Sequence, residues 1–412
     1  MRKLLARWRN GVFLLLVFVL FLLPRLSGLG HYVTPDELIW VFRTVQFREA
    51  VLVRAWSDTL VSGHPGITTT WLGMLGISLQ LWLRPESRLA YEWITHLAFF
   101  MPDNTAAFER LAVFLTSTRM LVAVVNSLGG TAVYLLVRRL WNYQTAWLAA
   151  LLLALDPFTA GLSGILHVDA LMTTFATLSL LTLLLAVDDV VMSRRWWVST
   201  VSGVMAALAV LSKTPALLLV PIAGLVFVVM IGRAWRARNG RARQLVLSGF
   251  IWGMAALITI LAAYPALWAG PGDVVRLLSG NAGRHIEEAL RPSFFLGQVT
   301  YNHGPLFYPV VLLFRLSPVV LVGLIVGAAL IWRQQRTPVG AGHKSILLLL
   351  WAVLYIGGIT FAAKKFDRYA LAVIPALIIL AAVAWSRLAQ MTPTIRRYWL
   401  PVLVGIQALY LV

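Results

Sequence analysis

The sequence opens with MRKLLARWRNGVFLLLVFVLFLLPRLSG (residues 1–28), a basic start followed by an apolar run from about residue 10. A run of about 20 mainly apolar residues can cross the hydrocarbon core of a bilayer as a helix. The run is too long for a cleavable signal peptide, and no small-residue cleavage site follows it. We therefore predict a first membrane-spanning helix whose N-terminus is held in the cytoplasm by the preceding cations. These cations are Arg2, Lys3, Arg7 and Arg9.

The composition of the 412-residue chain extends this pattern to the whole sequence. Apolar residues make up 60% and charged residues 12%, and the mean hydropathy is +0.81. Soluble domains are usually about half apolar and about a quarter charged, so the composition excludes a soluble enzyme. Abundant apolar surface also excludes a disordered chain. The chain has no cysteine, which excludes disulfides, zinc–thiolate sites and thiol nucleophiles.

The same length criterion predicts an all-α polytopic membrane protein with about eleven spans, which we treat as a single transmembrane domain over residues 1–412. The last candidate reaches Val412, which leaves open whether the sequence is a piece of a longer chain. The predicted spans lie near residues 10–28, 111–137, 144–158, 168–187, 196–211, 214–232, 245–263, 304–332, 346–362, 369–386 and 398–412.

The charges are distributed unevenly between the two sides. The chain has 35 Lys and Arg residues against 16 Asp and Glu, and its pI is near 11.1. Every second connection between predicted spans is basic, whereas Asp188 and Asp189 are the only acids in those connections. The positive-inside rule therefore explains the high pI without a nucleic-acid partner. The basic residues of these connections are Arg138, Arg139, Arg194, Arg195, Arg233, Arg236, Arg238, Arg241, Arg243, Arg333, Arg336, Lys344, Arg387, Arg396 and Arg397.

Two predicted extracytoplasmic segments are long, at about 29–110 and 264–303, and long loops often carry function. The first contains a stretch from Gly66 to Leu83 that is apolar enough to resemble a span. If this stretch crossed the membrane, all later Arg-rich connections would face outward. We therefore predict that it is interfacial or re-entrant.

The residues Thr34-Pro35-Asp36-Glu37 have the pattern of a helix start. Thr34 can cap the helix, Pro35 suits its first position, and Glu37 completes a capping box. An apolar stripe at helical spacing follows, which predicts an amphipathic helix lying on the outer leaflet. The stripe consists of Leu38, Val41, Phe42 and Val45.

The first turn of this helix places Asp36 among free backbone N–H groups at the positive end of the helix dipole. That setting keeps the carboxylate ionised, as a catalytic base or a cation ligand requires. The simpler alternative is that Asp36 and Glu37 only complement the dipole. For Glu37, capping is the favoured interpretation.

Three further outer connections contain polar candidates. His64 lies in the turn from Ser62 to Gly66, where it either contacts substrate or only lies at the interface. Asp169 starts a span, where it either caps the helix or presents a second carboxylate to the outer cavity. Lys213 lies in a short turn before Pro215, where it either snorkels to lipid headgroups or binds a phosphate.

The segment from Lys364 to Tyr369 places Lys364, Lys365 and Arg368 around one acid at an outer helix junction. The positive-inside rule disfavours cations there, and binding an anion from the outer leaflet would explain them. The alternative is a solvated turn that binds headgroups. The second long outer segment closes with an aromatic-rich stretch, in which His303 and Tyr308 are either substrate contacts or interface anchors.

These outer groups together suit the displacement of a phosphate leaving group. A carboxylate base can take a proton from an acceptor hydroxyl while cations stabilise the charge that develops on the phosphate. A phosphate carried by a membrane lipid lies at this depth. Asp36 and Asp169 could also hold a divalent cation, a role that the Lys and Arg cluster would otherwise take.

In the order of these motifs the chain resembles the GT-C superfamily of polytopic glycosyltransferases. It is similar to dolichyl-phosphate-mannose–protein mannosyltransferases and bacterial aminoarabinose transferases. No single motif is specific to the family. The specific features are the order of the motifs along nearly the whole chain and their predicted position on the same side of the membrane. The motifs are Pro35-Asp36-Glu37, His64-Pro65-Gly66, His167-Val168-Asp169, Ser212-Lys213, Tyr264-Pro265-Ala266-Leu267-Trp268, Phe307-Tyr308-Pro309 and the segment from Lys364 to Pro375.

The sequence also departs from the family pattern. The fuller His-Pro-Pro motif of the family is His64-Pro65-Gly66 here. The large soluble C-terminal domain of some relatives has no counterpart in these 412 residues, which leaves acceptor binding poorly specified.

The resemblance implies an enzyme that transfers a sugar from a polyprenyl-phosphate donor to an acceptor hydroxyl on the extracytoplasmic face, by direct displacement with inversion. It implies a hexosyl or pentosyl transferase of the mannosyltransferase type in the plasma membrane. Asp36 matches the acid of the first loop and is the expected base, Glu37 matches the second acid, and Asp169 matches an acid at a later helix start. The sugar and the acceptor, whether protein, polymer or lipid, stay open. The residues expected at the donor phosphate are Lys213, Lys364, Lys365, Arg368 and Tyr369.

The alternative from another class is a transporter or flippase for a lipid-linked glycan. Such a protein would share the outer cations but would need a polar path through the spans. Arg119 and Arg315 are the main charges within the predicted spans.

Overall fold

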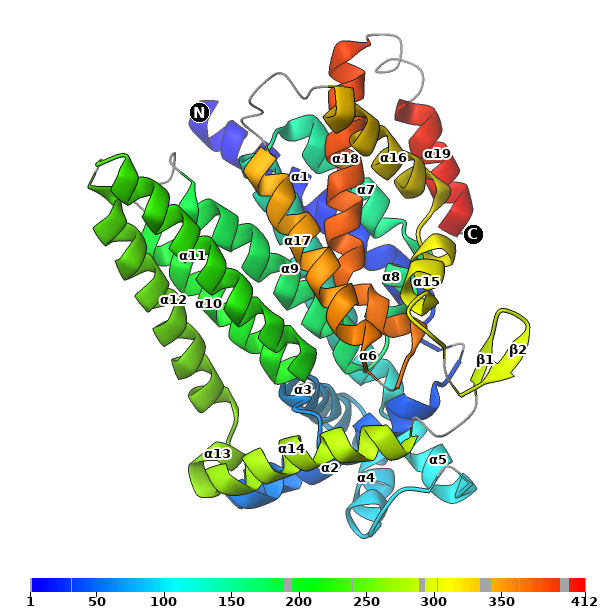
Figure 1. Ribbon diagram of the computed structural model, residues 1–412. Coiled ribbons are helices and arrows are strands. Elements are labelled where there is room, and N and C mark those ends of the chain that lie inside the picture. Colours follow the sequence, from blue (N-terminus) through cyan, green and yellow to red (C-terminus); the bar gives the residue numbers. More distant parts are fainter. Residues whose placement is uncertain are drawn as a thin grey trace.

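The computed structural model describes residues 2–30, 32–101, 103–188, 195–238, 240–288, 293–301, 303–333, 342–362, 364–392 and 400–411. Within these ranges the chain is almost entirely helical. A single antiparallel hairpin pairs β1 (Ser293–Phe295) with β2 (Gln298–Thr300) in the described part of the chain. Figure 1 shows long helices side by side in a bundle, with shorter helices crossing one end. The predicted all-α fold is confirmed.

The predicted spans each have a helical counterpart. By length and apolar composition, five described helices can cross a membrane, or seven when each of two bent pairs counts as one. The five are α6 (Leu115–Leu140), α9 (Val168–Val187), η4 with α11 (Thr214–Leu218 and Leu219–Arg236), α12 (Arg241–Ala263) and η5 with α18 (Asp367–Val373 and Ile374–Met391). Shorter apolar helical segments lie at the other predicted spans, within α1 (Arg2–Leu26), α10 (Arg195–Ser212), α17 (Gly342–Thr360) and α19 (Leu400–Leu411).

Two predicted spans are broken. The span predicted near 144–158 is α7 (Tyr143–Ala154) followed by α8 (Pro157–Ser163), with a bend of 65°. The span predicted over 304–332 consists of α15 (Phe307–Arg315) and α16 (Pro318–Arg333), and the helices bend by 114°. Each second helix begins at a proline, which has no N–H to continue a preceding helix. Each of these two predicted spans therefore corresponds to a bent pair of helices.

A layer of short helices crosses one end of the bundle (Figure 1). The apolar stripe predicted on α2 is buried, with Leu38 at 1% and Val41 at 0% exposure, in a cluster with residues of α3, α4, α5 and α6. The helix is amphipathic as predicted, but its apolar side packs against protein instead of the outer leaflet. The helices between α1 and α6 are α2 (Pro35–Leu52), η1 (Trp56–Thr59), α3 (Ile67–Leu83), η2 (Pro85–Ser87), α4 (Arg88–Thr95) and α5 (Thr105–Ala112).

The stretch predicted to be interfacial or re-entrant is α3, an apolar helix of 17 residues. It packs between α2 and α6, and a Cβ on Gly76 would lie 2.8 Å from the Cα of Thr118 in α6. Such close helix packing requires a glycine. Its depth relative to a bilayer stays a prediction.

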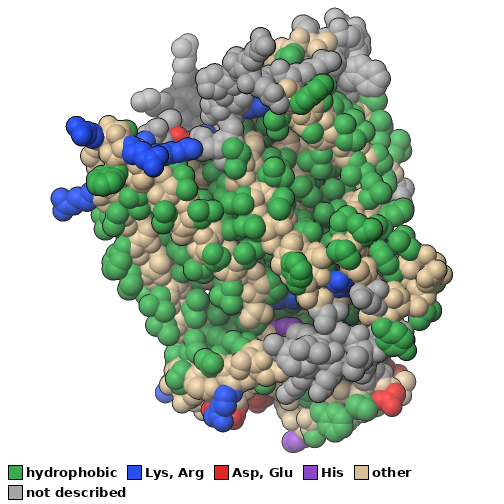
Figure 2. Space-filling model, viewed as in Figure 1, with side chains coloured by type: hydrophobic (Ala, Val, Ile, Leu, Met, Phe, Trp, Pro, Cys, Tyr) green, Lys and Arg blue, Asp and Glu red, His purple; other side chains and the backbone are tan. Residues whose placement is uncertain are grey.

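The two ends of the bundle differ in charge. Figure 2 shows a broad hydrophobic surface with Lys and Arg side chains at the end that carries the α11–α12 turn. Near the opposite end, the visible face carries Asp, Glu and His side chains together with some Lys or Arg side chains. At that opposite end, α13 (Ala266–Ala269) and α14 (Pro271–Glu288) lie alongside the α2 layer (Figure 1).

The core of the bundle is built around α9 and α18. The apolar segment of each of these spans is 89% buried. Helix α9 packs against α10, α6 and η5, so its N-terminus lies where several helix ends meet. Polar side chains at those ends are brought together there.

Candidate active site

Asp36 lies at the N-terminus of α2, where the predicted helix start is confirmed. Thr34 has an extended backbone, and its N–H donates to the Glu37 carboxylate at 3.2 Å as part of a capping box. Asp36 Oδ2 accepts a hydrogen bond from Arg368 Nη1 at 2.5 Å and lies 3.6 Å from His167 Nε2. The hydrogen bond with His167 and the charge of Arg368 hold the pKa of Asp36 well below its usual range, although burial opposes them.

His167 connects the two carboxylates of the site. It is the residue before α9, it is 6% exposed, and its Nδ1 lies 3.1 Å from Asp169 Oδ2. Its other nitrogen faces Asp36, so the imidazole lies between Asp36 and Asp169. Burial lowers the pKa of His167, but the charges and hydrogen bonds of the two carboxylates outweigh it and raise the pKa overall.

Lys213 completes the buried side of the site. Its Nζ donates to Asp169 Oδ1 at 2.5 Å and lies 3.8 Å from the centre of the Tyr369 ring. The lysine lies between Ser212, which ends α10, and the 3-10 turn η4. Burial lowers the pKa of Lys213, whereas the Asp169 charge beside it favours the protonated form.

Arg368, at the start of η5, contacts both carboxylates. Besides its bond to Asp36, its Nε lies 3.5 Å from Asp169 Oδ2. Asp36, His167, Asp169, Lys213 and Arg368 therefore form one cluster of two acids and three cationic groups. We call it the outer cluster, after the side of the membrane predicted for it from the sequence. It joins residues more than 300 positions apart in the sequence.

A cleft of about 480 Å³ adjoins the outer cluster through Arg368. Arg368, Arg315 and Asp367 give its wall a charged part, and Arg315 pairs with Asp367. The remaining wall is mainly apolar and aromatic, and Arg315 stacks over Phe158 at 5.0 Å. Such a cleft suits a ligand with a charged head and an apolar tail.

Comparisons with known proteins find sequence similarity to glycosyltransferases. The family model of dolichyl-phosphate-mannose-protein mannosyltransferase matches residues 107–240. The chain is 26% identical over 392 residues to an undecaprenyl phosphate-alpha-4-amino-4-deoxy-L-arabinose arabinosyl transferase of Pseudomonas aeruginosa, covering 94% of this chain and 61% of the relative. A transferase of the same name, numbered 1, from Pseudomonas fluorescens is 26% identical over 280 residues, covering 67% and 46%.

Solved structures agree on the fold. ArnT from Cupriavidus metallidurans bound to undecaprenyl phosphate has a TM-score of 0.62 at 17% identity, over 93% of this chain and 61% of that one. The archaeal oligosaccharyltransferase AglB from Archaeoglobus fulgidus, in complex with an inhibitory peptide and a dolichol-phosphate, has a TM-score of 0.50 at 16% identity, over 98% and 55%. The chain is thus similar in sequence and in fold to membrane glycosyltransferases, in line with its resemblance to the GT-C superfamily. It spans about three fifths of the length of the Pseudomonas aeruginosa relative.

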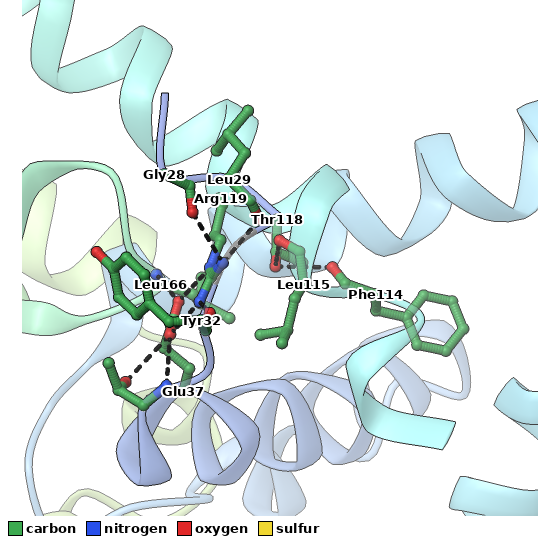
Figure 3. Close-up of polar contacts among 10 residues, drawn as sticks. Gly28, Leu29, Tyr32, Glu37, Phe114, Leu115, Thr118, Arg119 and Leu166 are labelled. Atoms are coloured by element: carbon green, nitrogen blue, oxygen red, sulfur yellow. Dashed lines mark hydrogen bonds and ion pairs between the residues drawn. The ribbon is translucent and has the colours of Figure 1, made fainter. Parts of the chain in front are cut away.

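Glu37 lies apart from the outer cluster. It is 0% exposed and binds Arg119 of α6 through both carboxylate oxygens, at 2.7 and 2.6 Å (Figure 3). Because no water reaches this carboxylate, it is poorly placed to take a proton from a substrate. The geometry favours the capping role that was the preferred interpretation of the sequence.

The remaining predicted residues lie at different distances from the outer cluster. Tyr369 is part of it through its contact with Lys213. Lys365 instead donates to the Gly304 carbonyl at 3.0 Å, and Lys364 lies over the Phe366 ring at 5.1 Å. These two lysines follow α17, and their role at the donor phosphate stays a prediction.

The three predicted substrate contacts are also separated. His64 lies in the turn whose Gly66 N–H donates to the Ser212 carbonyl at 3.2 Å, next to Lys213. His303 packs against Phe307 at 5.0 Å between ring centroids, and Tyr308 is fully buried beside the same ring. The turn with His64 therefore adjoins Lys213, and Tyr308 lies close enough to Tyr369 and Asp169 to interact with them electrostatically. The roles of the three residues as substrate contacts stay predictions.

The described residues contain no group of three or more His, Asp or Glu side chains arranged to hold a metal ion. Asp36 and Asp169, which could hold a divalent cation, each contact cationic side chains. Lys213 and Arg368 lie at the charge-balancing positions that a divalent cation would otherwise take between two carboxylates.

Three residues of the site were not assigned to it from sequence. His167 was quoted only as part of a motif, although a histidine two residues before an acid at a helix start is a local signal. Arg119 was considered only as a transporter charge, and it is buried against Glu37. Arg315 was considered in the same way, and it lies on the wall of the cleft.

Proposed function

We propose that this GT-C protein transfers a sugar from a polyprenyl-phosphate donor to an acceptor hydroxyl on the extracytoplasmic face. The observation that carries the proposal is the contact of Asp36 with Arg368, because it joins an ionised base to a cation on the wall of the cleft. The names of the relatives support a donor with a polyprenyl phosphate. Their sugar, 4-amino-4-deoxy-L-arabinose, favours a pentose-type donor over the mannose-type donor implied by the resemblance.

The proposed reaction is a single displacement. The acceptor oxygen attacks the anomeric carbon, its proton passes to Asp36, and the bond between that carbon and the phosphate oxygen breaks with both electrons leaving on the phosphate. Asp36 is suited to this because its side chain is 37% exposed and both of its described contacts are made by Oδ2. Oδ1 is then available to the acceptor. Attack opposite the leaving group inverts the anomeric centre.

The cations have distinct parts in this proposal. Arg368 stabilises charge on the departing phosphate while also fixing Asp36. Arg315 can turn from Asp367 toward a phosphate in the cleft, since both partners are partly exposed, at 48% and 38%. Lys364 and Lys365 are proposed to attract the donor from the leaflet. Lys213 neutralises Asp169 and leaves only one carboxylate, Asp36, to act as base.

We expect purified protein in nanodiscs to release polyprenyl phosphate from one member of a panel of polyprenyl-phosphate sugars. Mass spectrometry of the lipid fraction measures the release, and addition of the acceptor should raise it. A flippase would move the intact donor between leaflets without breaking the sugar–phosphate bond. Translocation in liposomes without any release from any donor would therefore contradict the proposal.

The proposed orientation is testable because the chain has no cysteine. A single cysteine at exposed Ser57, in the α2 layer, should react with a membrane-impermeant thiol reagent added to intact cells. A cysteine at exposed Ala237, in the basic α11–α12 connection, should react only after the membrane is permeabilised. The reverse labelling pattern would place the outer cluster in the cytoplasm and exclude the proposed face.

A further inference from the structure

The ion pair between Glu37 of α2 and Arg119 of α6 is the most completely buried charge pair adjoining the outer cluster in the described structure. Glu37 is 0% and Arg119 is 1% exposed. Arg119 Nε contacts Oε1 and Nη2 contacts Oε2, so the guanidinium grips the carboxylate through two parallel bonds (Figure 3). This two-point geometry fixes orientation as well as distance.

The remaining bonds of Arg119 go to backbone carbonyls of the link between α1 and α2. Nη1 donates to the Leu29 carbonyl at 2.7 Å, and Nη2 donates to the Tyr32 carbonyl at 2.5 Å. One side chain of α6 thus holds the chain just before the residue that starts α2. The approach of α2 to the bundle depends on these bonds.

The remaining bonds of Glu37 connect the two halves of the outer cluster. Oε1 accepts from the Leu166 N–H at 3.1 Å, and Oε2 accepts from the Thr34 N–H at 3.2 Å. Leu166 directly precedes His167, and Glu37 directly follows Asp36. A single carboxylate is therefore attached to the segments that supply Asp36 on one side and His167 with Asp169 on the other.

Stability alone is a poor explanation for this arrangement. A buried ion pair has a high desolvation cost, and well-packed apolar side chains often replace one without loss of stability. An ion pair whose other bonds all run to segments beside the reacting groups has a geometric use instead. A misplacement of about 1 Å between reacting groups can cost about 100-fold in rate.

We propose that Glu37 and Arg119 are positioning residues, whose buried ion pair sets the separation of Asp36 from His167 and Asp169. The inference rests on the proposed transferase function for its kinetic readout. It assigns Glu37 no proton transfer and no contact with substrate. It also gives Arg119 a part in the reaction that needs no polar path through the membrane.

The test uses Glu37→Gln in the full-length protein, because glutamine keeps the size of the side chain and removes the charge. We expect kcat to fall about 100-fold, while the KM for the donor changes by less than about threefold. Glu37 contacts the cleft wall only through Thr34 and has no recorded bond to Arg315 or Arg368, the cations of the cleft. Glu49→Gln is the matched control on the same helix, where Glu49 binds Arg48 and Tyr91 at the far end from Asp36. That control should leave kcat unchanged.

Hydrogen–deuterium exchange gives a second readout that does not need activity. In Glu37→Gln, peptides covering residues 28–34 and 164–168 should both exchange faster, and they should not do so in Glu49→Gln. A variant with unchanged exchange at 164–168, or with full kcat per folded molecule, would overturn the inference. If wild type releases no polyprenyl phosphate, the proposed function fails, and exchange alone still decides the positioning role. If Glu37→Gln does not fold, Arg119→Lys keeps the charge without the two-point grip and takes its place.

Discussion

Replacing Asp36 by asparagine is expected to lower kcat for sugar transfer by about 10²–10⁴-fold, the usual contribution of a general base. Asparagine has nearly the same size as aspartate but cannot take a proton from the acceptor hydroxyl. The Asp36 side chain is 37% exposed, so the substitution should leave the protein folded. Release of polyprenyl phosphate, followed by mass spectrometry with and without acceptor, measures the loss.

The control for this substitution is Asp58→Asn, which changes an exposed acid of η1 in the same layer of short helices. Asp58 makes its recorded contact with the neighbouring Ser57, so we expect wild-type kcat. Equal release by wild type and Asp36→Asn would remove Asp36 as the base. Asp169 would then be the next candidate, because Glu37 is enclosed by Arg119.

The pH profile gives an independent check of the charge states in the outer cluster. His167 and Arg368 hold the pKa of Asp36 below its usual value, so the base should stay ionised as the pH falls through about 4. The carboxylates raise the pKa of His167, so its protonated form should persist above about pH 6.5 and be lost as the pH rises further. We therefore expect activity to fall as the pH rises through this raised pKa. The pH profile of His167→Gln should lack this alkaline fall.

Hydropathy and charge were sufficient to place the bundle because both are local properties of the sequence. An apolar run of span length and a cluster of arginines are each visible within about 30 residues, and the structure has a helix at every predicted span. The helix start at Thr34 to Glu37 was also predictable, because four consecutive residues are enough to define a capping box. The Asp169 position at the start of α9 was predictable for the same reason.

The long-range pairings of the site were not predictable in this way. Arg119 and Glu37 are 82 positions apart, and Arg368 and Asp36 are 332 positions apart. The residues adjacent in sequence to Arg119 or Arg368 do not indicate which acid each arginine binds. A single arginine in an apolar helix is compatible with several roles. The 114° bend before α16 was missed because hydropathy averages over a proline. The apolar stripe of α2 was assigned to lipid because the spacing of apolar residues does not distinguish lipid from protein as the partner.

Separate replacement of Asp169 and Lys213 is expected to destabilise the protein more than replacement of both. The pair is buried, at 2% and 7% exposure, and its two charges are 2.5 Å apart. Breaking such a pair costs about 3–5 kcal/mol because the remaining charge loses its partner, whereas replacing both can be nearly neutral. We therefore expect Asp169→Asn and Lys213→Met each to lower the unfolding temperature in detergent, and the double variant to recover part of the loss.

Activity should behave differently from stability in this double-mutant cycle. Asp169 also contacts His167 and Arg368, the two groups that face Asp36, so its charge is needed to hold them in place. The double variant should be more stable than either single variant and yet as inactive as Asp169→Asn. Recovery of kcat along with stability would mean that the pair only supports the fold. Additive losses of stability, in contrast, would mean that the two buried charges do not depend on one another, against the contact between them.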